Sequence, residues 1–154
     1  MIEAIYLADG PGHTRRKVRT ASVVSGQGLV GDRNFGRTDY PGQNVTLIEA
    51  EEIESYNGRQ AQDIEAWKFG RNIVTRGMRL NSLVGKTFAI GPARFKGVEL
   101  CEPCAHLGRH LETDSMPAKQ CVKVLVHKAG LRADVVQDGS IEEGMALVID
   151  KGPI

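Results

Sequence analysis

The segment Phe69-Gly-Arg-Asn-Ile-Val-Thr75 predicts a short β-strand, the first of three that follow one another with only turns between them. Gly77 marks the next turn, and the second strand, Lys86-Thr-Phe-Ala-Ile90, ends at Gly91-Pro92. The third strand is expected from Ala93 to Leu100. Short apolar runs that glycine and proline punctuate are typical of β-rich proteins. This stretch therefore predicts a fold that is mostly β.

The same pattern extends towards both ends of the chain. Further strands are expected at Ile2 to Ala8, Arg15 to Val24, Asn44 to Ile48, Arg132 to Gln137 and Met145 to Asp150. Helices are expected at Glu49 to Tyr56, ended by Asn57-Gly58, at Glu102 to Leu111, with Pro103 in its first turn, and at Gln120 to Lys128. Roughly eight or nine strands with few helices and no regular strand–helix alternation favour a mainly antiparallel β-barrel. We expect residues 1–154 to form one domain.

Composition argues against several classes of protein. The formal net charge is +1 and aromatic residues make up 5% of the chain, so neither a nucleic acid nor an anionic membrane is an expected partner. No apolar run approaches the roughly 18–20 residues of a membrane span, and the N-terminus lacks the basic region of a signal peptide. Three cysteines, an odd number, favour a reducing environment. These features predict a cytoplasmic protein.

The segment Cys101-Glu-Pro-Cys104 lies between a predicted strand and a predicted helix. A helix N-terminus offers backbone N–H groups and a partial positive charge, both of which favour a thiolate. His106 and His110 follow in the same predicted helix, close enough to assist. We therefore expect the chemistry of this protein to centre on this segment, and on Cys104 above all.

Spacing alone leaves four interpretations of these cysteines open. A thioredoxin-like redox pair suits Cys-x-Pro-Cys, although such a motif comes early in a βαβ fold. A structural zinc site would use Cys101, Cys104, Cys121 and a histidine, although the second cysteine pair of most zinc sites is missing. Free cysteines are also often small buried hydrophobes. In the fourth interpretation, one thiolate binds a metal that prefers sulfur.

A glycine-rich loop, Gly28-Leu-Val-Gly-Asp-Arg-Asn34, is a candidate anion-binding site. Its backbone N–H groups can cradle an anion, and Arg33 can pair with a phosphate through two parallel hydrogen bonds. The alternative is a hairpin loop in which Asp32 and Arg33 are solvated. No Gly-Lys-Ser/Thr follows, so the loop is not a P-loop.

A second candidate site lies in the segment Phe69–Thr75, just before its apolar residues Ile73 and Val74. Arg71 and Asn72 are expected to point into the mouth of the barrel. The alternative places Arg71 at the surface and lets Asn72 cap a turn. Asn81 is expected to be structural, and His127 to be a partly buried histidine of the core.

These motifs occur together and in a fixed order. The second runs Arg71-Asn-Ile-Val-Thr-x-Gly-x-x-Leu-Asn-x-Leu-Val-Gly-x-x-Phe-x-Ile-Gly91, and Glu99-x-x-x-Pro-Cys-x-x-Leu107 follows it. With the glycine-rich loop before them and Gly130-Leu-Arg-Ala-Asp-Val-Val136 after them, the chain resembles the MOSC domain over nearly its whole length. That domain ends the molybdenum cofactor sulfurases. It also occurs alone in small bacterial proteins and within the mitochondrial amidoxime-reducing enzymes.

The resemblance implies a β-barrel with peripheral helices and a site for the molybdenum cofactor, molybdopterin. In the family, one protein cysteine is a ligand of molybdenum, and that position matches Cys104. The positions whose side chains contact the phosphate and pterin match, by the same resemblance, Asp32, Arg33, Arg71 and Asn72. Gln43 falls where larger relatives keep a polar residue. The pyridoxal phosphate domain of the sulfurases has no counterpart in this sequence.

Three functions are compatible with the resemblance. The first is a molybdenum-dependent reductase of a small N-hydroxylated compound, an amidoxime or an N-hydroxylated base. Its electrons would come from a partner protein, because the sequence offers no flavin or iron–sulfur site. The second is a sulfur carrier, in which Cys104 holds a persulfide received from a sulfur donor, and the third is a non-catalytic cofactor-binding module. The sequence also lacks the N-terminal β-barrel domain of the mitochondrial relatives, which implies either a more open site or one that a second subunit, in a homodimer, completes.

Overall fold

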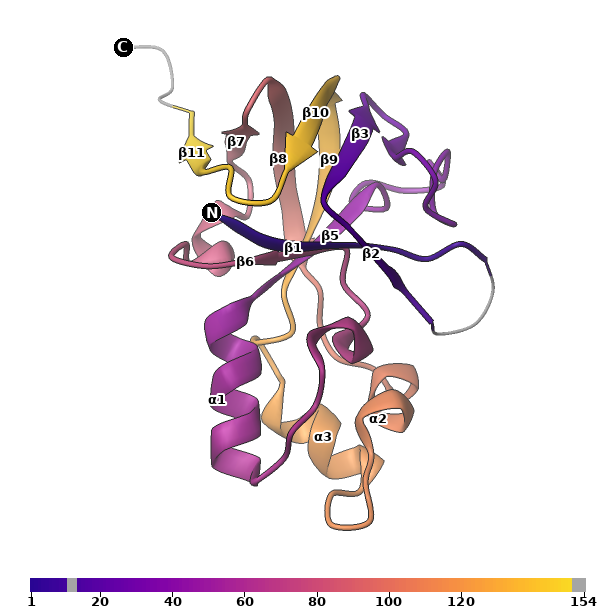
Figure 1. The fold of residues 1–154 in the computed structure, drawn as a ribbon, viewed down its shortest axis with the longest axis vertical. Coiled ribbons are helices and arrows are strands. Elements are labelled where there is room, and N and C mark those ends of the chain that lie inside the picture. The colour runs from indigo at the N-terminus through magenta and orange to yellow at the C-terminus, as the bar shows by residue number, and fades with distance from the viewer. Residues whose placement is uncertain (11–13, 151–154) are drawn as a thin grey trace.

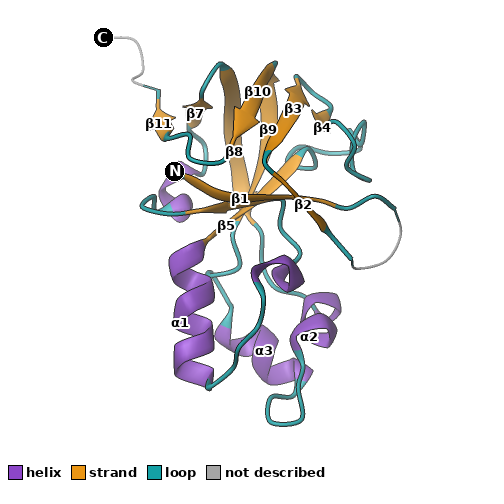
Figure 2. Ribbon diagram, viewed as in Figure 1, coloured by secondary structure: helices purple, strands orange, loops and turns teal. Residues whose placement is uncertain are grey.

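An eight-stranded mixed sheet organises the computed structural model, which describes residues 1–10 and 14–150. A three-stranded sheet packs beside it, and the helices gather at the opposite end (Figure 1, Figure 2). In order across the large sheet, the strands are β11 (Leu147–Ile149), β7 (Thr87–Ile90), β8 (Ala93–Leu100), β9 (Leu131–Gln137), β5 (Val45–Glu49), β6 (Ile73–Thr75), β1 (Ile2–Leu7) and β2 (Arg16–Val18). Those of the small sheet are β10 (Gly139–Glu142), β3 (Thr20–Val24) and β4 (Gly28–Leu29). The prediction of a mostly β fold is therefore confirmed.

The prediction of a closed barrel is wrong. β2 and β11 form the two ends of the large sheet and do not pair with each other. At Arg19 the chain leaves the large sheet and continues in the small one, so the strand that would extend the ladder beyond β2 is used elsewhere. β1 instead meets the loop before β11, where Ile2 N donates to Met145 O at 2.8 Å. The sheet is also not purely antiparallel, because β5 and β6 run parallel.

The parallel pair follows from the helix between its strands. Parallel neighbours need a crossover connection, and α1 (Ala50–Gln60) with η1 (Ala66–Phe69), a 3-10 helix, provides it. The predicted end of this helix at Asn57-Gly58 is wrong. The Asn57 side chain bonds the chain beyond the helix, accepting from Ile64 N at 2.9 Å and donating to Ile64 O at 3.0 Å. The left-handed turn that ends α1 therefore falls later, at Ala61.

The other helices also begin or end away from the expected residues. α2 (Ala105–Leu111) begins after Cys104, so Pro103 precedes the helix instead of occupying its first turn. α3 (Ala118–Val124) begins earlier than predicted, and turns replace its expected last residues. A second 3-10 helix, η2 (Leu80–Leu83), was not expected. None of the helices in the described part of the chain has the length and apolar character that crossing a bilayer requires.

Two apolar cores lie on the two faces of the large sheet. One fills the space between the two sheets, where the rings of Phe88 and Phe95 stack at 5.5 Å. The other lies between the large sheet and the helices, where Tyr56 meets Phe69 edge to face. Each buried side chain of this size contributes about 1.5–3 kcal/mol through removal of apolar surface from water. The alternation of side chains along β5 leaves one polar residue, Thr46, on the helix-facing side of the sheet, and the polar site begins there.

Candidate functional site

Asn72, which immediately precedes β6, is the centre of a buried polar network. Its Oδ1 accepts hydrogen bonds from Thr46 N at 3.1 Å and from Thr46 Oγ1 at 3.2 Å. Its Nδ2 donates to Tyr6 O at 3.1 Å and to Asp32 Oδ1 at 3.2 Å. With 2% of its surface exposed, the side chain has all its bonding capacity used within the protein. The structure therefore gives Asn72 a scaffolding position between β1, β5 and the glycine-rich loop.

Asp32 holds the glycine-rich loop against the end of β1. Its Oδ1 accepts from Ala8 N at 2.8 Å, and its Oδ2 accepts from Asn34 N at 3.2 Å. The carboxylate is buried, so the alternative of a solvated Asp32 is wrong, and its contact with a cofactor remains a prediction. Arg33 follows with its side chain exposed, and its backbone N–H donates to Ala8 O at 2.7 Å. Asp32 thus positions Arg33 beside the end of β1.

The three cysteines have different surroundings. Cys101 is buried and its backbone N–H donates to Gly130 O at 2.8 Å, which ties the segment to the start of β9. Cys121 is buried in the helical core, where Tyr56 donates its hydroxyl proton to the Cys121 sulfur at 3.2 Å. Cys104 is exposed at the residue that caps α2, and its side chain makes no capping hydrogen bond. Cys104 is thus the exposed thiol of the three.

The zinc and redox-pair interpretations find no support in this arrangement. No group of three histidine, cysteine, aspartate or glutamate side chains in 1–10 and 14–150 could hold a metal ion. All three cysteines are free thiols. Cys101 and Cys121 instead match the interpretation of cysteines as small buried hydrophobes, because both belong to the apolar interior.

The Glu102 side chain fixes the cysteine segment, Cys101–Cys104, to the turn after α3. Glu102 accepts hydrogen bonds from His127 N and from His127 Nδ1, each at 2.7 Å. The prediction of His127 as a core histidine is wrong, because its side chain is exposed. Asn81 donates to His127 O at 2.9 Å, so its structural role is confirmed. Glu102 therefore orients the segment that presents Cys104.

Arg71 joins the cysteine segment to the sheet. Its Nε donates to Ala129 O at 2.8 Å, and its Nη2 donates to Cys101 O at 3.3 Å. Burial lowers the pKa of Arg71, an effect that Arg132 reinforces and that Cys101 and Cys104 oppose. The alternative that put Arg71 simply at the surface does not describe this position. Its guanidinium places a positive charge beside the thiols of Cys101 and Cys104. Because α2 has only seven residues, we assign the positive charge near Cys104 to Arg71 and not to the N-terminus of that helix.

Arg71 belongs to an arginine cluster that also contains Arg15, Arg33 and Arg132. Asp32, Arg33 and Arg71 all act electrostatically on Arg15, and Arg132 acts on Arg71. Arg15 and Arg132 were not among the predicted site residues. The signal for Arg15 was the basic run Arg15-Arg-Lys, which was interpreted only as the start of a strand, and Arg132 lay unassigned within the last motif.

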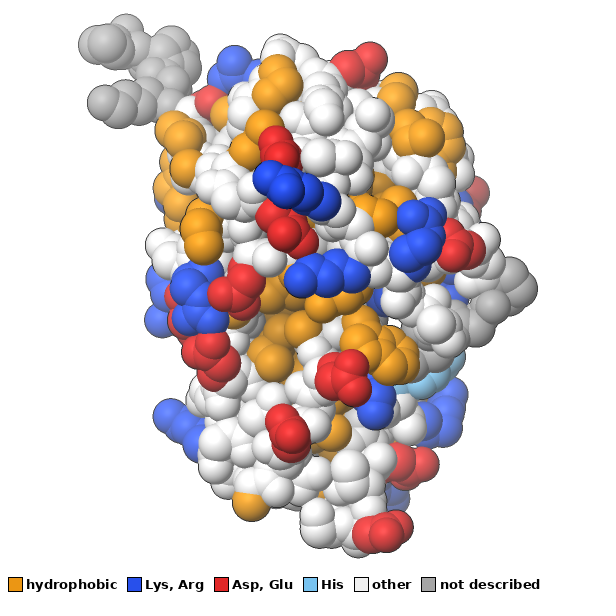
Figure 3. Space-filling view, in the orientation of Figure 1, with side chains coloured by type: hydrophobic (Ala, Val, Ile, Leu, Met, Phe, Trp, Pro, Cys, Tyr) orange, Lys and Arg blue, Asp and Glu red, His pale blue; other side chains and the backbone are white. Residues whose placement is uncertain are grey.

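Two histidines of α2 lie at the edge of this cluster. His106 and His110 occupy successive turns, and their Nε2 atoms are 3.0 Å apart. Burial lowers the pKa of His110, as do His106, Arg109, Arg33 and Arg15 in decreasing order. Histidine and basic side chains lie together at the right edge of the molecule, where α2 approaches the sheets (Figure 3). His110 therefore lies within reach of the positive charges of Arg15 and Arg33.

The last predicted residue, Gln43, is turned towards its own loop. Its Oε1 accepts a hydrogen bond from Tyr40 N at 3.2 Å. Tyr40 and Asn44, on either side of it, line a hollow of about 650 Å³ at the start of β5. The contact of Gln43 with a cofactor remains a prediction.

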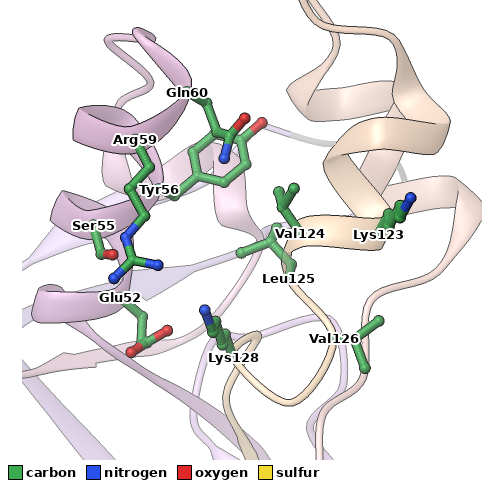
Figure 4. A pocket seen from close by; sticks show the side chains of 10 residues that line it. All are labelled: Glu52, Ser55, Tyr56, Arg59, Gln60, Lys123, Val124, Leu125, Val126 and Lys128. Carbon is green, nitrogen blue, oxygen red and sulfur yellow. The ribbon is translucent and has the colours of Figure 1, made fainter.

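The clearest hollow in the helical layer does not contain the predicted residues. It measures about 330 Å³, and its lining comes from α1 and from the end of α3 with the turn after it (Figure 4). The side chains that line it are Glu52, Ser55, Tyr56, Arg59, Gln60, Lys123, Val124, Leu125, Val126 and Lys128. We place the candidate site at Cys104 and the arginine cluster instead, because an exposed thiol lies there close to the partly buried guanidinium of Arg71, whereas the lining of this hollow contains no cysteine.

The fold and this site define a β-rich protein with a thiol-containing, positively charged site of the kind that suits an anionic metal cofactor. The chain belongs to the MOSC domain family, whose model matches residues 31–148. This family is associated with binding of the molybdenum cofactor. No curated protein matches the chain.

Solved structures with the same fold come from several bacteria. The YuaD protein of Bacillus subtilis is 18% identical with a TM-score of 0.84, over 96% of this chain and 93% of YuaD. YiiM of Geobacillus stearothermophilus is 18% identical with a TM-score of 0.74, over 98% of this chain and 76% of YiiM. YiiM of Escherichia coli is 16% identical with a TM-score of 0.71, over 99% of this chain and 70% of that protein. At these identities the likeness shows the fold.

The residues present fit the molybdenum cofactor. A phosphate is best held by guanidinium groups, and Arg15 has a buried Nη1 without a hydrogen-bond partner among the described residues. Molybdenum prefers a soft ligand such as sulfur, and Cys104 exposes one. Cys104 would hold the metal and the arginine cluster the phosphate.

Proposed function

We propose that this protein binds the molybdenum cofactor at Cys104 and the arginine cluster and reduces a small N-hydroxylated compound there. The observation that carries the proposal is the exposed Cys104 thiol beside the partly buried guanidinium of Arg71. Sulfur is a soft ligand that suits molybdenum, and a guanidinium suits the phosphate of the cofactor. When bound, the cofactor supplies a metal that exchanges two electrons and accepts oxygen from a substrate.

The overall reaction balances with an external electron donor. An amidoxime or an N-hydroxylated base takes up two electrons and two protons, its N–O bond breaks, and the products are the amidine or the free base and water. The electrons come from a partner protein that carries a redox group. On the protein side, Arg71 holds the cysteine segment through Ala129 O and Cys101 O, and the Asn72 network (Asn72 with Thr46, Tyr6 and Asp32) holds the loop that presents Arg33.

Metal analysis of protein made in a molybdenum-replete host tests the proposal. We expect about one molybdenum per chain in the wild type and a loss of most of it in Cys104→Ala, because the soft ligand is removed. Cys101→Ala is the matched control, since its thiol is buried, and it should keep the metal. Equal molybdenum in Cys104→Ala and wild type would remove the ligand assignment, and no molybdenum in the wild type would remove the proposal.

The exposure of Cys104 also favours a second function, that of a sulfur carrier. A donor persulfide would pass its outer sulfur to Cys104, which would leave a Cys104 persulfide and a donor thiol. Intact-mass spectrometry distinguishes the two functions. A persulfide on Cys104 in metal-free protein that turns over no N-hydroxylated compound favours the carrier, whereas an unmodified thiol with bound molybdenum favours the reductase.

A further inference from the structure

Arg15, which directly precedes β2, carries a buried charge with an unsatisfied donor. Its Nη1 is buried and has no hydrogen-bond partner among the residues that the structure describes. A buried donor without a partner loses its hydration and gains nothing in return. Burial accordingly lowers the pKa of Arg15 to about 10. Burial of this side chain therefore lowers the free energy of unfolding, unless another group accepts a hydrogen bond from Nη1.

The groups around Arg15 do not supply that partner. Asp32 acts favourably on it, but the Asp32 carboxylate already accepts hydrogen bonds from Ala8 N, Asn34 N and Asn72 Nδ2. Arg33 and Arg71 both act unfavourably, as like charges. A partly buried guanidinium on which two like charges act is stabilised by a bound anion.

The neighbour in sequence shows what an ordinary surface arginine does at this place. Arg16 is exposed, and its Nη2 pairs with Asp9 Oδ1 at 3.1 Å. Arg15, one residue before β2, differs from Arg16: its Nη1 is buried, and the charges that act on it include those of Arg33 and Arg71.

We propose that Arg15 is a ligand-binding residue, which donates to an oxygen of a phosphate group that Arg33 and Arg71 also contact. A phosphate monoester dianion matches several guanidinium groups, since each can donate two parallel hydrogen bonds to it. The identity of the phosphate as that of the molybdenum cofactor rests on the proposed function. The role of Arg15 as a phosphate ligand does not.

Three variants in a phosphate-free buffer test this inference: Arg15→Met, Arg15→Lys and, as the matched control, Arg16→Met. The probe is inorganic phosphate, and the readout is the rise in unfolding temperature that it causes. Arg15→Met should be as stable as wild type or more stable without phosphate, because it removes an unsatisfied buried donor. It should bind phosphate about tenfold or more weakly, since a hydrogen bond to a charged group is lost. Arg15→Lys should be intermediate, and Arg16→Met should equal wild type.

Three outcomes would overturn the inference. They are a full phosphate response in Arg15→Met, a loss of stability in Arg15→Met without phosphate, and no phosphate response in the wild type. The second readout is the amount of pterin and molybdenum that wild type and Arg15→Met each retain on purification. Equal retention in wild type and Arg15→Met would overturn the inference and leave the proposed function standing. A phosphate response that depends on Arg15, in a wild type that carries no pterin, would support Arg15 as a ligand and end the proposed function.

Discussion

The Asn72 network and the arginine cluster lie side by side in the molecule but differ in how their polar atoms are satisfied. Arg71 and Asn72 are consecutive residues, and each belongs to one of the two groups. The amide of Asn72 uses its donors and acceptors on Thr46, Tyr6 and Asp32. In the cluster, guanidinium groups repel one another, and Arg15 keeps a buried donor that has no partner among residues 1–10 and 14–150.

The difference separates residues whose side chains bond the fold together from residues that we propose bind a ligand. A buried polar group that is fully bonded stabilises one arrangement of the chain. Like charges that are brought together at a thiol cost stability, and proteins keep such arrangements where they serve a site. The same motif therefore contributes a scaffold residue and a candidate binding residue at adjacent positions.

The largest expected effect comes from breaking the network. Asn72→Ala leaves Thr46 N, Tyr6 O and Asp32 Oδ1 without their partner in a buried place, and should lower the free energy of unfolding by about 3–5 kcal/mol. Urea denaturation measures this. The control, Asn81→Ala, loses a single exposed hydrogen bond and should cost about 1 kcal/mol or less. Equal costs for the two variants would show that the network is not what holds the fold here.

Removal of Arg71 should lower the free energy of unfolding less than Asn72→Ala does, but it should weaken binding of the cofactor. Arg71→Met loses the bonds to Ala129 O and Cys101 O but also removes a charge that burial disfavours, so we expect a loss of about 1–2 kcal/mol. Retained molybdenum should fall by at least about tenfold, because the positive charge beside Cys104 is lost. If Arg71→Met were as unstable as Asn72→Ala but retained its molybdenum, Arg71 would be a structural residue and not a binding residue.

The smallest effect concerns the pH dependence of stability. Burial and the positive charges of His106, Arg109, Arg33 and Arg15 lower the pKa of His110 below 6.5, the ordinary value. Below pH 6.5 the unfolded chain therefore takes up a proton before the folded one does, and the free energy of unfolding falls as the pH falls towards the folded-state pKa. The variant His110→Gln should lose the contribution of His110 to the pH dependence of the free energy of unfolding.

Added phosphate sharpens the same measurement. An anion in the arginine cluster would offset the positive charge near His110 and reduce the difference between wild type and His110→Gln. Parallel stability curves for the two proteins between about pH 5 and 7, where histidine titrates, would show that the cluster does not act on His110.

Most of the strands, and the choice of Cys104 as the candidate cysteine, could be predicted from the sequence. Apolar runs between glycine turns located most of the large sheet, because burial of one face and tight turns are encoded locally. Motif order singled out Cys104 over Cys101, and the structure exposes the first and buries the second. β10 was missed because Gly139-Ser-Ile-Glu has a single apolar residue, Ile141, and becomes a strand by pairing with β3.

Only the tertiary structure decided the shape of the sheet and the roles of the polar residues. Whether a sheet closes depends on where the chain leaves it, which here is Arg19, and no local pattern records that. Asp32 and Arg33 are neighbours in one loop, yet one is buried as a clamp and the other is exposed at the site. Arg15 comes next to Arg33 and Arg71 only through folding, because charge interactions act across space and not along the sequence.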